Sequence, residues 1–250
     1  MLKFYRILLL TLVAVFLAST AGIARYAADS CTQSRMYRQL AALTENFPGD
    51  AVSTGNNFLP QYQALYTQNS DLAGWIQIDG TGINYPVMQS KHDPDFYLKH
   101  NFEKADSPHG CPYVQANCDL QTPSDNILVY GHNMKNGSMF GMLKKYRADE
   151  TLYNTSKYFW ILTPEKDYRY EIIAAYTTSV NSDTYTLFKG PGKEFLEYEK
   201  KMFQNSEIRT DATASEANVK DKIVTLSTCT GNQATRFVVQ GKRVNAVNPQ

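Results

Sequence analysis

The chain has 250 residues, of which 25 are lysine or arginine and 24 are aspartate or glutamate, so its formal net charge is +1. The length fits one domain of ordinary size plus an appendage, and a hydrophobic content of 43% suffices for a sizeable core. The balanced charge argues against a nucleic-acid-binding protein, which needs a basic face. The sequence has no GxGxxG or P-loop pattern, so no nucleotide or other cofactor is predicted.

The N-terminus carries a long apolar run. Lys3 and Arg6 precede the run from Ile7 to Ala24, and Arg25 follows it. Its length of about 18 residues reaches the lower limit for a membrane-spanning helix. The positive flank predicts a cytoplasmic N-terminus and an extracytoplasmic body, held at the membrane by this single helix. A cleaved signal peptide is the alternative, since small residues lie towards the end of the run. Both hypotheses predict export of the body.

The pattern of composition divides the chain into three parts. Residues 1–28 are expected to form a cytoplasmic stub and transmembrane anchor, residues 29–70 a helical and linker region, and residues 71–250 the main domain. In the second part, apolar spacing predicts an amphipathic helix over Ser30–Asn46, and a short helix is expected over Gln61–Gln68. Proline and glycine between these two helices indicate a linker.

The main domain alternates short apolar runs with turn residues, which is typical of strands. The predicted strands are Trp75–Ile78, Ile83–Met88, Cys111–Gln115, Asn126–His132, Tyr158–Leu162, Tyr168–Ser179, Lys222–Ser227 and Arg236–Val247. Pro86 makes the second of these an edge strand or a bulged one. Helices are expected over Ser138–Tyr146, capped by Ser138, and over Lys193–Ile208. About eight strands with few helices predict a mainly β fold, a closed or nearly closed barrel.

The four cysteines do not have the spacing of a zinc site, because the sequence contains no CxxC pair and no HExxH pattern. Cys111 and Cys118 could form a disulfide across a short loop in an extracytoplasmic domain. Two free thiols are the alternative. Cys31 lies close to the apolar run, and Cys229 lies between two predicted strands.

Three residues at the ends of apolar strands could form a catalytic site. Cys229 follows the run Lys222–Ser227, His132 ends an earlier run, and Arg236 opens the last one. A thiolate is a nucleophile, and an imidazole can take and return its proton near neutral pH. An arginine stays charged and can stabilise an oxyanion. Because a barrel gathers strand ends on one rim, these side chains are expected to meet.

Each of these residues alone has a simpler explanation. Cys229 could be a small core residue, His132 a loop histidine bonded to the backbone, and Arg236 a surface residue of a strand. The remaining histidines lie in polar loop sequence and are expected to be solvated: His92, His100 and His109.

Two segments contain the candidate catalytic residues: Thr225-Leu226-Ser227-Thr228-Cys229, which is followed by Arg236, and Tyr130-Gly131-His132-Asn133-Met134. In these segments, and over most of Leu72–Val247, the chain resembles a sortase, and among sortases class B. Trp75-Ile76-Gln77-Ile78 and Asn84-Tyr85-Pro86-Val87 are similar to the opening of class B members. The N-terminal anchor and the short helices before the barrel fit the same class.

This resemblance implies an eight-stranded sortase barrel and a transpeptidase that anchors surface proteins to the Gram-positive cell wall. Cys229 would attack the threonine carbonyl in the sorting motif of an exported protein, and His132 would act as general acid and base. Arg236 would bind the carbonyl and stabilise the oxyanion. An amine of peptidoglycan or of its lipid-linked precursor would resolve the acyl-enzyme. The substrate groove would include four further residues: Ser227, Thr228, Tyr185 and Asn84.

Two other functions are compatible with the same residues. A pilin-polymerising sortase would use the same chemistry and join the motif to a lysine of another subunit. A catalytically silent, surface-tethered barrel would only bind peptides.

No metal is predicted, because the sequence lacks an acidic cluster like the calcium site of some class A sortases.

Overall fold

The computed structural model describes residues 2–44, 60–120, 124–164, 167–188 and 190–244. The chain separates into two compact units, Met1–Leu40 and Ala41–Gln250. The expected linker between the two N-terminal helices, most of the turn after Pro164 and the end of the last predicted strand lie outside the described residues.

The first unit is helical. The helix α1 runs without interruption over Leu2–Ala42, so the apolar run and the expected amphipathic helix after it are one element of 41 residues. Residues Lys3–Ala42 are apolar and long enough, by length and composition, to cross a membrane. Leu10 and Phe16 are about two-thirds exposed, at 68% and 67%. A helix suits a bilayer because it satisfies all its backbone hydrogen bonds internally, and α1 is therefore a candidate membrane anchor.

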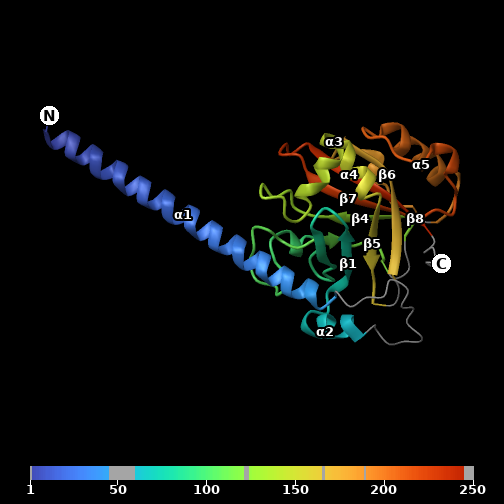
Figure 1. The fold of residues 1–250 in the computed structure, drawn as a ribbon, viewed down its shortest axis with the longest axis horizontal. Coiled ribbons are helices and arrows are strands. Elements are labelled where there is room, and N and C mark those ends of the chain that lie inside the picture. The colour runs from blue at the N-terminus through green and yellow to red at the C-terminus, as the bar shows by residue number, and fades with distance from the viewer. Residues whose placement is uncertain (1, 45–59, 121–123, 165–166, 189, 245–250) are drawn as a thin grey trace. The chain divides into compact units, whose positions relative to one another are not determined.

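The second unit is built on a closed β-barrel (Figure 1). Its described strands follow one another around the barrel in the order β1-β2-β3-β4-β7-β8-β6-β5, and β5 pairs back onto β1. Their bounds are β1 Leu72–Ile78, β2 Ile83–Met88, β3 Tyr113–Val114, β4 Asn126–Tyr130, β5 Tyr158–Leu162, β6 Asp167–Ser179, β7 Ile223–Cys229 and β8 Thr235–Val244. The predicted eight-stranded barrel is confirmed.

Two of the strand pairs are parallel, β2 with β3 and β4 with β7, and the other pairs are antiparallel. The longest ladder joins β6 to β8, from Arg169↔Val244 to Ser179↔Thr235. Gly241 of β8 lies against the Phe159 ring, where an added Cβ would come within 2.2 Å of a ring carbon. Only glycine fits this crossing of β8 over the stacked rings of Phe159 and Tyr170.

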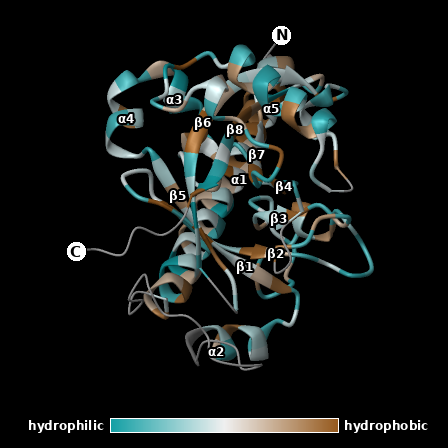
Figure 2. Ribbon diagram, turned by 90° about the vertical axis from the view of Figure 1, so that its right-hand side faces the viewer, coloured by the Kyte–Doolittle hydropathy of each residue, from teal (hydrophilic) through white to brown (hydrophobic). Residues whose placement is uncertain are grey.

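Short helices close the ends of the barrel (Figures 1 and 2). Their bounds are α2 Pro60–Gln68, α3 Lys145–Ala148, α4 Glu150–Thr155 and α5 Lys193–Asn205, with 3-10 turns η1 Phe96–Leu98, η2 Gly141–Lys144, η3 Asp183–Tyr185 and η4 Ala214–Glu216. Both views place α3, α4 and α5 at one end of the barrel and α2 at the other.

The core has two parts, the barrel interior and the layer beneath α5. Side chains of β7 are buried from Ile223 to Thr228, and Ile223 packs in the cluster beneath α5. Residues 195, 198, 199 and 202 form the buried face of α5, at the three- and four-residue spacing of one helical face. Figure 2 shows hydrophobic colour along β1, β2 and β6 and mixed colour on α5. Burial of each large apolar side chain here contributes about 1.5–3 kcal/mol.

Several boundaries differ from prediction. The helix expected over Ser138–Tyr146 begins only at η2, and Ser138 does not cap it, since its amide and hydroxyl bond to Asn136 Oδ1. Met139 has a left-handed φ of 54°, which a helix excludes. The strand expected over Cys111–Gln115 is reduced to two residues. β7 extends two residues further than predicted and includes Cys229.

β2 is not an edge strand, because it pairs with β1 on one side and with β3 on the other. Its ladder with β3 consists of Met88↔Tyr113 alone. Pro86, which has no N–H to donate, lies ahead of that pair and opposite Trp75 of β1. The short β3 therefore lets a proline stand within a closed barrel.

The structure shows whether Cys111 and Cys118 form a disulfide, and it corrects the predicted exposure of one histidine. Cys111 and Cys118 are buried free thiols, which lie near different acceptors, Pro86 O at 3.5 Å and Asn126 O at 3.7 Å. His109 was expected to be solvated, but it is only 2% exposed. Its loop folds against η1, where the Cys111 amide donates to Tyr97 O, so polar local sequence is covered by a distant segment.

A buried carboxyl on α5 should make stability depend on pH. Glu199 is fully buried, and burial raises its pKa well above the ordinary range, with Asp221 adding to the rise and Lys242 opposing it. Lys242 Nζ lies 3.8 Å from Glu199 and 3.5 Å from Asp221, so one ammonium serves two carboxyls. The folded state then binds a proton that the unfolded state releases above its pKa of about 4.3.

We predict that wild-type stability falls as pH rises from 5 to 8, and that Glu199→Gln flattens this fall. Each unit by which the folded pKa exceeds the unfolded one corresponds to about 1.4 kcal/mol. Chemical denaturation of the full chain in detergent at several pH values measures the effect. Glu197→Gln, an exposed change on the same helix, should keep the wild-type slope; equal slopes for wild type and Glu199→Gln would contradict the prediction.

Candidate active site

The site lies where the parallel strands β4 and β7 end. Tyr130 pairs with Ser227, and the ladder continues as the Gly131 amide donates to Ser227 O at 3.1 Å. Thr228 Oγ1 donates to Gly131 O at 2.8 Å. Two residues beyond the last pair, β4 leads to His132 and β7 to Cys229. Since side chains alternate along strands, the shared register brings these two residues to one side of the barrel rim.

Cys229 is directly opposite Arg236 in the antiparallel ladder of β7 and β8. Opposite residues of such a ladder have Cβ atoms about 4.5–5.5 Å apart and face the same side. Cys229 is exposed as a free thiol, and its carbonyl accepts a hydrogen bond from Asn133 Nδ2 at 2.8 Å. Asn133 thereby ties the end of β7 to the residues that follow β4.

His132 is oriented by a main-chain carbonyl from another part of the chain. Its Nε2 lies 2.7 Å from Leu98 O, at the end of η1. A carbonyl oxygen only accepts, so Nε2 carries the hydrogen and the neutral ring has its lone pair on Nδ1. Gly110 lies beneath the ring with a left-handed φ of 56°, and a Cβ there would be 2.9 Å from Leu98 O and 3.1 Å from His132 Cδ2.

The guanidinium of Arg236 is held by its own loop. Nη1 donates to Gln233 O at 3.0 Å and to Thr235 O at 2.9 Å. An arginine offers five N–H groups in a rigid fork, so Nε and Nη2 can still face an oxygen in the cavity. The arrangement places a fixed positive charge beside the thiol of Cys229.

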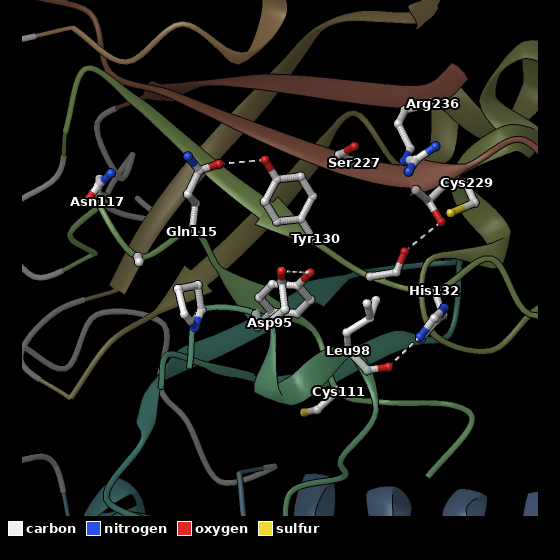
Figure 3. A pocket seen from close by; sticks show the side chains of 15 residues that line it. Asp95, Leu98, Cys111, Gln115, Asn117, Tyr130, His132, Ser227, Cys229 and Arg236 are labelled. Carbon is white, nitrogen blue, oxygen red and sulfur yellow. Dashed lines mark hydrogen bonds between the residues drawn. The ribbon is translucent and has the colours of Figure 1, made fainter. Parts of the chain in front are cut away.

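These residues stand at one end of a cavity of about 520 Å³ (Figure 3). Figure 3 shows Cys229, His132 and Arg236 at one end and Gln115 and Asn117 at the other. Its lining is mixed: Pro94, Asp95, Leu98, Cys111, Tyr113, Gln115, Ala116, Asn117, Tyr130, Gly131, His132, Ser227, Thr228, Cys229 and Arg236. A cavity of this size, whose lining combines apolar surface with hydrogen-bonding groups, suits a peptide.

Hydrogen bonds organise the cavity walls between these two ends. The Tyr130 hydroxyl donates to Gln115 Oε1 at 2.6 Å, and the Tyr113 hydroxyl donates to Asp95 Oδ1 at 3.2 Å. Burial raises the pKa of both phenols. The two tyrosines are therefore neutral donors near physiological pH, and both line the cavity.

The four predicted groove residues have different positions. Ser227 and Thr228 line the cavity. Tyr185 lies behind its wall and meets Ser227, with its hydroxyl 3.0 Å from Ser227 Oγ. Asn84 lies apart from the lining residues, on β2, where its Oδ1 accepts from Trp75 Nε1 at 2.5 Å.

Sequence reasoning did not select several residues of this site. Leu98 acts through its carbonyl, which no side-chain pattern reveals. Gly110 could have been noticed as a glycine in a polar loop, but its contact with His132 is tertiary. Asn133 could have been identified from the sequence, because it directly follows His132 in the segment that carries the resemblance. Within the described parts of the chain, no group of three His, Cys, Asp or Glu side chains could hold a metal ion.

Comparisons with known proteins agree on one family. The sortase domain family model matches residues 76–244. The chain is similar to sortase B of Listeria monocytogenes, with 34% identity over 202 residues, 78% of this chain and 79% of that protein. It is 29% identical to sortase B of Staphylococcus aureus over 170 residues, 68% of each chain.

Solved structures of sortase B have the same fold. The sortase B of B. anthracis in complex with AAEK1 superposes with a TM-score of 0.76 at 31% identity, and covers 87% of this chain and 99% of its own. The Staphylococcus aureus sortase B–substrate complex has a TM-score of 0.75 at 25% identity, with 88% of this chain and 100% of its own covered.

The position of Gly110 yields a prediction about the histidine. Gly82 has a similar left-handed φ of 72° with nothing within 4 Å, so Gly82→Ala should cost only the backbone strain, about 1–2 kcal/mol. Gly110→Ala should cost more, about 3 kcal/mol or above, because the Tyr97 and Leu98 carbonyls must move.

Denaturation of the full chain in detergent measures the two costs. Nitrogen NMR of selectively labelled histidine should show that Gly110→Ala, and not Gly82→Ala, weakens the Nε2–H signature of His132. Equal costs and unchanged His132 spectra in both variants would contradict this assignment.

Proposed function

The chain belongs to class B of the sortase family, and we propose that it is a cysteine transpeptidase that attaches exported proteins to the cell wall. One observation carries the proposal. The register of β4, β7 and β8 brings His132, Cys229 and Arg236 together at one end of a peptide-sized cavity. A nucleophile, a proton carrier and a fixed cation are the parts that acyl transfer requires.

In the proposed first half-reaction, Cys229 Sγ attacks the threonine carbonyl of a sorting motif. The thiol proton passes to His132 Nδ1, the nitrogen left free by the bond to Leu98 O. The carbonyl oxygen becomes an oxyanion, and the Arg236 guanidinium stabilises it. Collapse of the tetrahedral intermediate breaks the peptide C–N bond, and His132 returns the proton to the leaving amine.

In the proposed second half-reaction, an amine replaces the leaving group. His132, now neutral, takes a proton from the incoming amine as it attacks the thioester carbonyl. The C–S bond breaks, His132 gives that proton to the departing thiolate of Cys229, and an amide forms. An amine of peptidoglycan or of its lipid-linked precursor is the acceptor we propose. A lysine of another surface subunit would lead to a pilin polymer instead.

The cavity is proposed to bind the sorting motif of secreted surface proteins. Its end at Cys229 would hold the scissile threonine, and the residues before it would extend towards Gln115 and Asn117. Ser227 and Thr228 line this path. A relative, the sortase B of Staphylococcus aureus, has been solved as a substrate complex, which supports a peptide partner for this cavity.

The enzyme is proposed to work outside the membrane. α1 is apolar enough to anchor it, and Lys3 and Arg6 favour a cytoplasmic N-terminus. The body that follows would then face the secreted substrates and the wall amine.

Loss of the thiol tests the activity. We predict that Cys229→Ala lowers cleavage of a fluorogenic sorting peptide by at least about 10³-fold and abolishes the thioacyl adduct seen by mass spectrometry. Cys118→Ala, which removes a buried thiol away from the cavity lining, should retain the adduct. Peptide binding by wild type without any adduct would instead identify a silent peptide-binding barrel.

The shape of the cation should also matter. We predict that Arg236→Lys lowers kcat by about 10²-fold or more, since lysine keeps the charge and loses the planar fork. Peptide affinity, measured on chains that also carry Cys229→Ala, should change much less. An Arg236→Lys variant with wild-type kcat would remove Arg236 from the proposed mechanism.

Cys31 can report the topology, because it is exposed and follows the apolar run. In intact cells that make the Cys229→Ala chain, a membrane-impermeant maleimide is expected to label Cys31 while the chain stays with the membrane fraction. The control is the same chain with Cys31→Ser. Labelling only after lysis would reverse the proposed topology, and a labelled chain in the medium would indicate a cleaved signal peptide.

A further inference from the structure

A buried amide at the start of β4 contacts the backbone on both sides of Tyr185. Asn126 is completely buried. Its Nδ2 donates to Thr184 O at 3.2 Å and to Thr186 O at 3.0 Å. These two carbonyls belong to the residues immediately before and after Tyr185, so one side chain ties down the backbone on both sides of that residue.

Asn126 is itself held by a network of buried polar groups. Thr225 Oγ1 donates to Asn126 Oδ1 at 2.8 Å, and Gln240 Nε2 donates to Thr225 Oγ1 at 2.9 Å. The Tyr198 hydroxyl, on α5, donates to Thr184 O at 2.9 Å and lies 3.0 Å from Asn126 Nδ2. A fully paired buried network is rigid, because each unpaired group would cost about 1–3 kcal/mol.

Tyr185 transmits this restraint to the cavity wall. Its hydroxyl is 3.0 Å from Ser227 Oγ, and its ring stacks against Tyr130 with a centroid distance of 6.4 Å. Ser227 and Tyr130 both line the cavity, while Tyr185 is outside the lining. Figure 3 shows Ser227 and Tyr130 on the wall between the end at Cys229 and the end at Gln115.

We propose that Asn126 is a positioning residue for substrate binding: it fixes the turn at Tyr185, and Tyr185 braces Ser227 and Tyr130 in the wall that receives the sorting motif. The inference rests on the proposed transpeptidase function. An asparagine suits the position because it offers two N–H donors and one acceptor without charge. Its effect should fall on peptide binding, since Cys229 and Arg236 are held by other contacts.

The test compares Asn126→Leu with Thr225→Val in the full chain in detergent. Both changes remove a buried polar group of the same network at nearly constant volume. Of these two residues, Asn126 donates to the carbonyls that flank Tyr185, whereas Thr225 donates to Asn126 Oδ1. Tyr198→Phe is a milder second variant, because it removes only the hydroxyl that donates to Thr184 O.

We expect Asn126→Leu to raise KM for the sorting peptide about tenfold and to change kcat less than about twofold. Tyr198→Phe should raise KM about threefold. Thr225→Val should lower the melting temperature with KM near the wild-type value. Because Asn126 acts through Tyr185, combining Asn126→Leu with Tyr185→Phe should raise KM less than the product of the single effects.

Two further measurements separate this inference from the proposed chemistry. Peptide Kd values on chains that carry Cys229→Ala should repeat the KM pattern whether or not the wild type turns over. Hydrogen exchange of residues 182–188 should speed up in Asn126→Leu and Tyr198→Phe and stay slow in Thr225→Val. Equal KM, Kd or exchange effects in Asn126→Leu and Thr225→Val, or fully multiplicative effects with Tyr185→Phe, would overturn the positioning role.

Discussion

The parallel pairing of β4 with β7 is the constraint on which the site depends. β4 ends near residue 130 and β7 near residue 229, and their five registered pairs run from Asn126↔Ile223 to Tyr130↔Ser227. Parallel strands place their carboxyl ends at the same edge of a sheet, so the residues after each strand meet there. A slip of β4 by one residue would turn every side chain of that strand to the other face, and His132 would no longer face the side of Cys229.

Buried hydrogen bonds between side chains also stabilise the pairing of β4 with β7. Asn126, the first residue of β4, and Thr225, on β7, share a hydrogen bond. Gln240 of β8 and Tyr198 of α5 complete that network. Apolar packing alone would hold α5 against the barrel in several similar positions, whereas paired donors and acceptors select one of them. The cluster that buries α5 is thereby linked to the wall of the cavity.

The other wall comes from the segment between β2 and β4. η1 supplies Leu98 O to His132, and the left-handed turn at Gly110 lets that backbone approach the imidazole. The residues that line the cavity thus come from five stretches of the chain, within 94–98, 111–117, 130–132 and 227–229 and at 236. The single pair between β2 and β3 leaves this segment free to follow a course that a longer ladder would forbid.

The sequence predicted those features that local chemistry controls. The apolar run after Lys3 and Arg6 indicated an anchor-like helix, the alternation after Leu72 indicated a barrel, and the segments around His132 and Cys229 indicated the family. It did not determine that His109 is buried, that Leu98 orients His132, or that Asn126 supports Tyr185. The contact of Leu98 with His132 and those of Asn126 around Tyr185 join residues tens of positions apart. Which distant residues come into contact depends on strand register, and the register is set by the closed barrel.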